Sequence, residues 1–151
     1  MITYQQEFMV TADRQEAEAL MKADWEEIRS PAKGDKFEID WDTYLKLEEL
    51  GVLKVFTARD NNELVGYFSV LLSPVLHNRG SIQAVSDAFY VRKDFRKGFV
   101  GIKLFKFVES CLLEDGHRGL VVTSTEAYPL DRLLTRMGYV KAETQYYKDL
   151  T

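Results

Sequence analysis

The chain has 151 residues, of which 46% are apolar and 29% charged, and its formal net charge is −4 at pH 7. These values are typical of one soluble globular domain, residues 1–151, that is long enough to bury a core. The acidic balance argues against a general nucleic-acid binder, and no uncharged run approaches the roughly 18 residues that a membrane-spanning helix needs.

The first third of the chain is expected to form a strand and two helices. The strand covers residues 2–9. Thr11 or Asp13 can cap the first helix, with Glu16 at capping-box spacing from Asp13. The run "SPAKGDK", with Pro31 and Gly34, ends this helix, and a second helix runs from Asp40 or Asp42 to about Leu50.

Strands dominate the middle of the chain, and strands and helices alternate after it. The polar turn "DNNE" between two β-rich runs predicts a hairpin. The expected elements are strands at Leu53–Arg59, Leu64–Leu72 and Ile82–Arg92, a helix at Gly98–Glu114, a strand at 119–125, a helix at Leu130–Met137 and a closing strand in "YVKAETQYYKDL".

This order predicts an α/β (α+β) fold whose central sheet is mixed and mostly antiparallel. A strand, a helix and a second strand follow one another between Ile82 and residue 125, so these two strands should run parallel with a right-handed crossover. Parallel neighbours in such a sheet can part at their carboxyl ends, where ligands bind in open α/β sheets.

Positive charge is concentrated where this crossover begins. Residues 92–106 hold six Lys or Arg against one Asp, in a chain that is acidic overall. A surface turn with solvated cations is one interpretation. The other is an anion site, because a helix start offers unpaired N–H groups and glycines let a phosphate come close. The segment is not a Walker A loop.

The segment Arg96-Lys97-Gly98-Phe99-Val100-Gly101 resembles the phosphate loop R/Q-x-x-G-x-G/A of the GCN5-related N-acetyltransferases. Arg96 and Gly101 stand at the family's spacing, but Phe99 stands where the family has its first glycine. The ending "LLTRMGYVKAETQYYKDL" resembles the family's final motif, and the sequence of residues 87–105 resembles the bacteriophage-encoded branch of the family.

The resemblance implies a single acetyltransferase domain with acetyl-CoA as cosubstrate and direct acetyl transfer to an amine. It implies that the backbone of Phe89–Val91 supplies a hydrogen-bond donor to the thioester and that Thr123 and Ser124 bind the pantetheine arm. Phe99 is expected to turn its side chain into the core. The residues expected to bind the cofactor are Phe89, Tyr90, Val91, Arg96, Lys97, Gly98, Phe99, Val100, Gly101, Thr123 and Ser124.

Asp87 is the expected general base. Strand alternation places it on one face with Val85, Phe89 and Val91, where a lone carboxylate is costly unless a site uses it. It also lies four residues before Val91, at the position where several amine acetyltransferases of the family that the chain resembles carry a Glu that acts as the general base. A structural carboxylate at a bulge or turn is the alternative.

The general acid is expected to be a tyrosine. Leu134 occupies the position where the family often has this tyrosine. Tyr146 is the preferred substitute, with Tyr128, Tyr147 or solvent as alternatives.

The acceptor is expected to be a cationic amine, either a small molecule or a protein lysine or N-terminus. Residues 35–50 hold six acids with Trp41 and Tyr44 among them, which suits an ammonium group, although a solvated helix face gives the same pattern. A non-catalytic protein that uses this fold to bind coenzyme A or a protein partner is the alternative function.

The remaining expectations concern metals, location and partners. His77 and His117 have no further ligand at metal spacing, so no metal site is expected. The single cysteine, Cys111, excludes an internal disulfide and fits a reducing compartment. We therefore expect a cytoplasmic protein (host cytoplasm if phage-encoded), with no nucleic-acid or membrane partner and a homodimer as one possible assembly.

Overall fold

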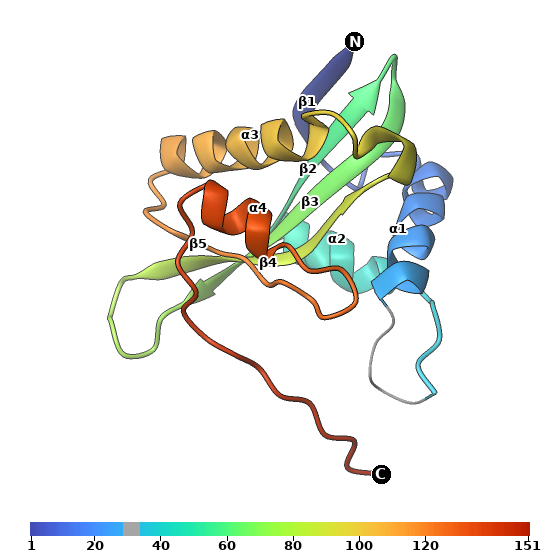
Figure 1. Ribbon diagram of the computed structural model, residues 1–151. Coiled ribbons are helices and arrows are strands. Elements are labelled where there is room, and N and C mark those ends of the chain that lie inside the picture. The colour runs from blue at the N-terminus through green and yellow to red at the C-terminus, as the bar shows by residue number, and fades with distance from the viewer. Residues whose placement is uncertain (29–33) are drawn as a thin grey trace.

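The computed structural model describes residues 1–28 and 34–151. Figure 1 shows one twisted sheet with helices packed on it. None of the described helices is long and apolar enough to cross a membrane. Pro31 lies outside the described residues. The elements are β1 (Ile2–Glu7), α1 (Arg14–Ile28), α2 (Trp41–Glu49), β2 (Leu53–Asp60), β3 (Glu63–Pro74), β4 (Ile82–Val91), a 3-10 turn (Lys93–Phe95), α3 (Val100–Glu114), β5 (Leu120–Val121) and α4 (Asp131–Arg136).

The sheet has the strand order β1-β2-β3-β4-β5. The first four strands are antiparallel neighbours, and β4 and β5 run parallel, which confirms the predicted mixed sheet. The predicted hairpin is formed by β2 and β3, with Asn61 and Asn62 both at positive φ (48° and 74°). Two left-handed residues in a two-residue loop match the twist of a β-hairpin.

The two faces of the sheet are covered by different helices. The face under α3 and α4 carries the largest cluster of buried side chains, centred on Phe56, Phe68 and Phe105. The opposite face packs against α1 through Leu20 and Met21, and against α2 through a separate, smaller cluster. Because both faces are covered, most of β3 is buried on both sides.

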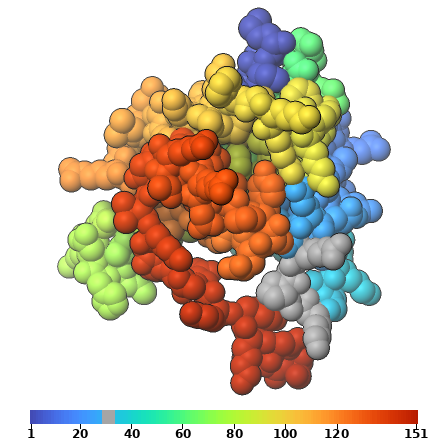
Figure 2. All heavy atoms as spheres, viewed as in Figure 1, coloured from blue at the N-terminus to red at the C-terminus, as the bar shows by residue number. Residues whose placement is uncertain are grey.

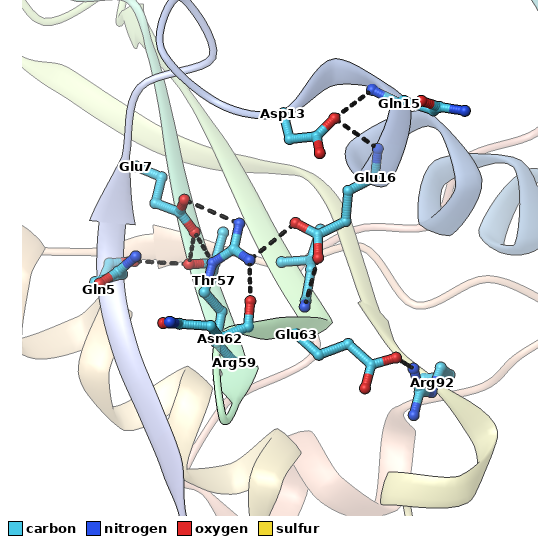
Figure 3. A network of polar contacts seen from close by, with 11 residues as sticks. Gln5, Glu7, Asp13, Gln15, Glu16, Thr57, Arg59, Asn62, Glu63 and Arg92 are labelled. Atoms are coloured by element: carbon cyan, nitrogen blue, oxygen red, sulfur yellow. Dashed lines mark hydrogen bonds and ion pairs between the residues drawn. The ribbon is translucent and has the colours of Figure 1, made fainter.

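An arginine ties the start of α1 to the sheet. Arg59 of β2 donates to the Glu7 carboxylate of β1 (Nε to Oε2, 2.9 Å) and to Glu16 of α1 (2.9 Å), as Figure 3 shows. It also donates to the Asn62 carbonyl (2.7 Å). Asp13 caps α1 as expected, since its Oδ1 accepts from the Glu16 amide. The Glu16 side chain, however, binds Arg59 and the Leu64 amide and so does not close the capping box.

The carboxyl-terminal part of the chain differs from the prediction. The expected strand at 119–125 is reduced to Leu120–Val121. The expected closing strand is wrong, because residues 139–151 form neither helix nor strand and run outward from the body. Within the described chain, β5 is therefore the last strand of the sheet.

Candidate active site

The parallel strands part soon after they meet. The only paired positions of β4 and β5 among the described residues are Ala84 with Leu120 and Val85 with Val121. Just beyond these pairs, a side chain of β4 replaces the backbone as hydrogen-bond acceptor: the Thr123 amide donates to Ser86 Oγ (3.0 Å). In the described part of the chain no strand pairs with Phe89–Val91 on this side. The carboxyl end of β4 therefore has no strand paired with it on the β5 side within the described chain.

The segment after β4 leads into an open helix start. The helix α3 begins at Val100, and its N-cap residue Phe99 makes no side-chain cap bond. The first turn has no acidic residue, and Lys97, Gly98 and Phe99 are exposed. Because the first amides of an α-helix lack intrahelical acceptors, this helix start can hold an anion.

The cations of this segment divide into two groups. Arg92 pairs with Glu63 (2.6 Å) and Asp94 (2.7 Å), and Arg96 pairs with Glu27 (2.7 Å). The lysines Lys93, Lys97, Lys103 and Lys106 are exposed, and no ion pair within the described residues involves them. The charges that face solvent here are therefore lysines.

Arg96 was expected to face a bound phosphate, but its guanidinium is engaged by other groups of the chain. Both terminal nitrogens of its guanidinium bind the Glu27 carboxylate of α1 (2.7 and 2.8 Å), and Nε donates to the Val91 carbonyl (2.7 Å). The group also lies over the rings of Tyr90 and Tyr128, 5.1 and 4.7 Å from their centroids. The hydrogen bonds from Arg96 lower the pKa of Glu27. Arg96 thus joins α1 to the end of β4.

The expectation for Phe99 is wrong. Its side chain is 70% exposed and does not enter the core, because a residue at the N-cap precedes the face that α3 turns to the sheet. Gly101 lies against β4, where a Cβ would meet Phe89 Cζ at 3.4 Å, an ordinary van der Waals contact.

Asp87 lies on the opposite face from the one predicted. The register of β3 and β4 shifts between Ser69–Ala88 and Val70–Ser86, which leaves Asp87 as the extra residue of a β-bulge. Its Oδ2 accepts from Ser69 Oγ (3.2 Å), on the face of α1 and α2, whereas Phe89 packs in the cluster under α3. The bulge breaks the alternation that had grouped Asp87 with Phe89.

Sequence reasoning missed a second aspartate on this face. Asp24 of α1 is only 5% exposed, and the Tyr67 hydroxyl of β3 donates to its Oδ2. Its other oxygen, Oδ1, is buried and has no hydrogen-bond partner among the described residues. A signal was present, because Asp24 follows Ala17, Leu20 and Met21 at helical spacing and so belongs to the apolar stripe of the helix.

The environment of Asp24 favours its neutral form. Burial raises the pKa of Asp24 to about 6, with contributions from the charges of Glu27 and Asp87, although the Tyr67 hydrogen bond and Arg96 oppose this. Burial, followed by the charges of Asp87 and Asp24, raises the pKa of Tyr44 to about 12. Burial and Asp24 also raise the pKa of Tyr67 well above its ordinary value. This face therefore holds three carboxyl groups, those of Asp24, Glu27 and Asp87, and the neutral phenols of Tyr44 and Tyr67 in electrostatic contact.

The remaining predicted residues are separated from one another. Ser124 accepts from the Leu130 amide (2.8 Å) and donates to Asp131 (3.1 Å), so its hydroxyl serves the start of α4. Thr123 is exposed beside Ser86. Tyr146 is 94% exposed and belongs to the segment that runs outward from the body, and no hydrogen bond among the described residues joins it to Asp87. Its role as acid stays a prediction. The ring of Tyr128, an alternative acid, lies under the Arg96 guanidinium of the loop.

Sequence comparisons give no relative for this chain. No family model matches it, and no curated protein matches it.

Solved structures, in contrast, match it over its whole length. A ribosomal-protein-alanine N-acetyltransferase from Brucella melitensis biovar Abortus aligns with a TM-score of 0.72 and 18% identity, covering 100% of this chain and 99% of that chain. An aminoglycoside acetyltransferase from an uncultured soil metagenomic sample, in complex with sisomicin, gives 0.75 and 17%, covering 99% and 97%. AAC(6')-Iy, in complex with a bisubstrate analogue of coenzyme A, gives 0.69 and 16%, covering 100% and 99%.

These likenesses establish the fold. The mixed sheet and its helices have the arrangement of the GCN5-related N-acetyltransferases, as the sequence resemblance implied. A transcriptional regulator from Bacillus halodurans has the same arrangement, with a TM-score of 0.74 at 16% identity. At such identities the chemistry depends on this chain's own site.

Proposed function

We propose that this protein is an acetyl-CoA-dependent N-acetyltransferase that acts on a cationic amine. The observation that carries the proposal is the course of β4. Its bulge turns Asp87 to the face of α1 and α2, and its end leads into the open start of α3. One strand thus links a base to an anion site, and the acetyltransferase fold of the whole chain supports this pairing.

The residues at the start of α3 suit the phosphates of coenzyme A. The exposed stretch Lys97–Phe99 offers backbone groups without side-chain cover at Gly98, where a Cβ would meet nothing within 4 Å. Lys93 and Lys97 add positive charge in solvent. Backbone amides and lysines together are the usual partners of a pyrophosphate. We assign cofactor binding to these groups and to the backbone of Phe89–Val91.

The chemistry requires one proton acceptor and one proton donor. The cosubstrate supplies an acetyl thioester, whose C–S bond breaks as the C–N bond to the amine forms. Asp87 takes the proton that the ammonium must lose to expose its lone pair, directly or through one water. The leaving sulfur gains a proton from a tyrosine, with Tyr146 or Tyr128 as candidates, or from solvent.

The acceptor side follows from the charges on the α1 and α2 face. Asp24, Glu27 and Asp87 interact electrostatically there, and the guanidinium of Arg96, the cation that acts on Asp24, is bound by Glu27. The rings of Tyr44, Tyr67 and Tyr90 lie on the same face. A negative, aromatic surface attracts an ammonium group, so we propose a cationic small molecule or a protein amine as acceptor.

The test separates binding from turnover. We expect calorimetry to show acetyl-CoA binding, and thiol release to follow when a panel of amines is added. Asp87→Ala should bind acetyl-CoA like the unmodified protein and lose at least tenfold in turnover, whereas Asp115→Ala, at the far end of α3, should change neither. Absence of acetyl-CoA binding at tens of micromolar would contradict the proposal.

One observation favours the alternative, a non-catalytic protein that binds coenzyme A or a partner. Leu134, at the position where a tyrosine acid is usual, is buried among apolar side chains. Cofactor binding without thiol release from any amine would support that function. The reducing cytoplasm and the bacteriophage origin remain predictions from the sequence.

A further inference from the structure

We propose that the ring of Tyr128 is a gate. It closes the space beside the end of β4 by lying against the Arg96 guanidinium, and it moves aside to admit the pantetheine arm of acetyl-CoA. The inference rests on the proposed function, because that function assigns cofactor binding to the backbone of Phe89–Val91. It adds a conformational step that precedes cofactor binding.

The space lies on the β5 side of β4, at the carboxyl end of the strand. The Arg92 amide donates to the Val65 carbonyl of β3 (2.8 Å). Because successive residues of a strand direct their backbone groups to opposite neighbours, the Val91 carbonyl points away from β3, to the β5 side. No strand that the structure describes pairs with it there. A cofactor arm that binds the backbone of β4 would therefore lie on this side.

Arg96 is the fixed side of the gate. Its Nε donates to the Val91 carbonyl (2.7 Å), which places the side chain on the β5 side of β4. Its terminal nitrogens bind both carboxylate oxygens of Glu27 on α1 (2.7 and 2.8 Å), and the two side chains are only 20% and 18% exposed. A two-pronged bond to a carboxylate fixes the plane of a guanidinium, so this side chain holds one orientation.

Tyr128 is the side that can move. Its ring centroid lies 4.7 Å from Arg96 Cζ, and its hydroxyl makes no hydrogen bond to any described residue. Its backbone, in contrast, is anchored, because the Thr125 hydroxyl donates to its carbonyl (3.3 Å) and accepts from its amide (3.2 Å). A ring contact with a cation is weaker than hydrogen bonds to a carboxylate. The ring can therefore turn away while the backbone and Arg96 stay in place.

The contact between Arg96 and Tyr128 closes one end of the space between the two strands. The other end is closed by the hydrogen bond from the Thr123 amide to Ser86 Oγ (3.0 Å). Figure 2 shows the segment after β5, in orange, directly beside α1, in blue, and the turn before α3, in yellow. An arm that enters between these two contacts therefore meets the Tyr128 ring.

Such a gate acts on association and not on dissociation. A ligand that binds only the open form has its affinity lowered by the fraction of molecules that are open. Once the arm is bound, the ring is already displaced, so the gate does not affect departure. This asymmetry distinguishes a gate from a residue that contacts the bound cofactor.

Rapid mixing with a fluorescent etheno-adenine analogue of acetyl-CoA tests the proposal. Tyr128→Leu removes the ring and should raise the association rate constant and the affinity by about fivefold each, with an unchanged dissociation rate constant. Tyr128→Met also lacks the ring and should behave in the same way. Tyr128→Phe is the matched control. It keeps the ring beside Arg96 and loses only the hydroxyl, so its rate constants should equal those of the unmodified protein.

A second probe separates the arm from the phosphates. Adenosine 3′,5′-diphosphate carries phosphates but no arm, so Tyr128→Leu should not change its affinity. An equal gain for this probe, or an unchanged association rate for the acetyl-CoA analogue, would overturn the gate and leave the proposed function standing. If neither the unmodified protein nor Tyr128→Leu binds acetyl-CoA, the proposed function and the gate both fail.

Discussion

Two arginines hold the two ends of α1, and they do so in different electrostatic surroundings. Arg59 binds Glu16 near the start of the helix and Glu7 of β1 (Figure 3). Arg96 binds Glu27 near the end of the helix and also the carbonyl that closes β4. Between them Asp24 is buried, and no ion pair within residues 1–28 and 34–151 involves it. Both regions stabilise the fold, but the second also holds the buried carboxyl group of Asp24 where we place the acceptor.

The largest effect is expected when the Arg96 contact is removed. Arg96→Met leaves Glu27 without its partner and frees the Val91 carbonyl, which should cost about 2 kcal/mol of unfolding free energy. Because Arg96 also fixes the turn before α3, acetyl-CoA affinity should fall at least tenfold. Urea unfolding and calorimetry measure the two effects.

Arg59→Met is the matched control for this comparison. It should cost a similar amount of stability, about 2 kcal/mol, because it also removes charged hydrogen bonds, but acetyl-CoA affinity should not change. Equal loss of affinity in both variants would show that α1 responds as a whole and that the two ends do not differ.

Asp24 should lower stability at neutral pH. Its folded-state pKa of about 6 lies above the ordinary value of 3.8, so the folded chain binds this proton more tightly than the unfolded chain does. The folded chain must therefore lose stability as the pH rises from about 4 through about 6. Asp24→Asn, which still accepts from Tyr67, should raise the unfolding free energy at pH 8 by on the order of 2 kcal/mol and change it little at pH 4.

Two outcomes of that experiment are informative. A gain at pH 8 accompanied by weaker acceptor binding would support Asp24 as part of the acceptor surface. A loss of stability at pH 8 would contradict the assignment of Asp24 as a destabilising charge.

The Arg59 region should respond to pH in the opposite direction. Burial opposes ionisation of Glu7, but hydrogen bonds from Arg59 and Thr57 outweigh it and lower its pKa. Stability from Glu7 is therefore present above its unfolded pKa and is lost as the pH falls through the lower, folded value. Glu7→Gln should cost about 1 kcal/mol at pH 7 and less at pH 3. A cost that grows toward low pH would be inconsistent with this role.

The smallest effect is expected for an exposed lysine. Lys97→Gln removes one solvent-facing charge near the start of α3, so acetyl-CoA affinity should fall about threefold at low salt and less at high salt. Lys106→Gln, two turns into the helix, serves as the control and should lose less. Thermal unfolding should be unchanged in both, because neither lysine has an ion pair within the described residues.

Local patterns in the sequence predict the fold well and the site less well. The hairpin at Asn61–Asn62 and the crossover through α3 were predicted because turn chemistry and periodicity are local properties. The face of the sheet on which Asp87 lies was not predicted. It depends on a bulge, and the bulge depends on how β4 pairs with β3, which the sequence of β4 alone does not specify. The orientation of Arg96 likewise depends on Glu27, a partner 69 positions away.

The two-residue turn between β2 and β3 has a consequence for the order of folding. Closing a short loop costs little chain entropy, so this hairpin can form early from neighbouring residues. The pairing of β4 with β5 must wait until the connecting segment and α3 have been placed. We therefore expect the sheet to grow outward from β2 and β3, with the edge that borders the site among the last parts to become ordered.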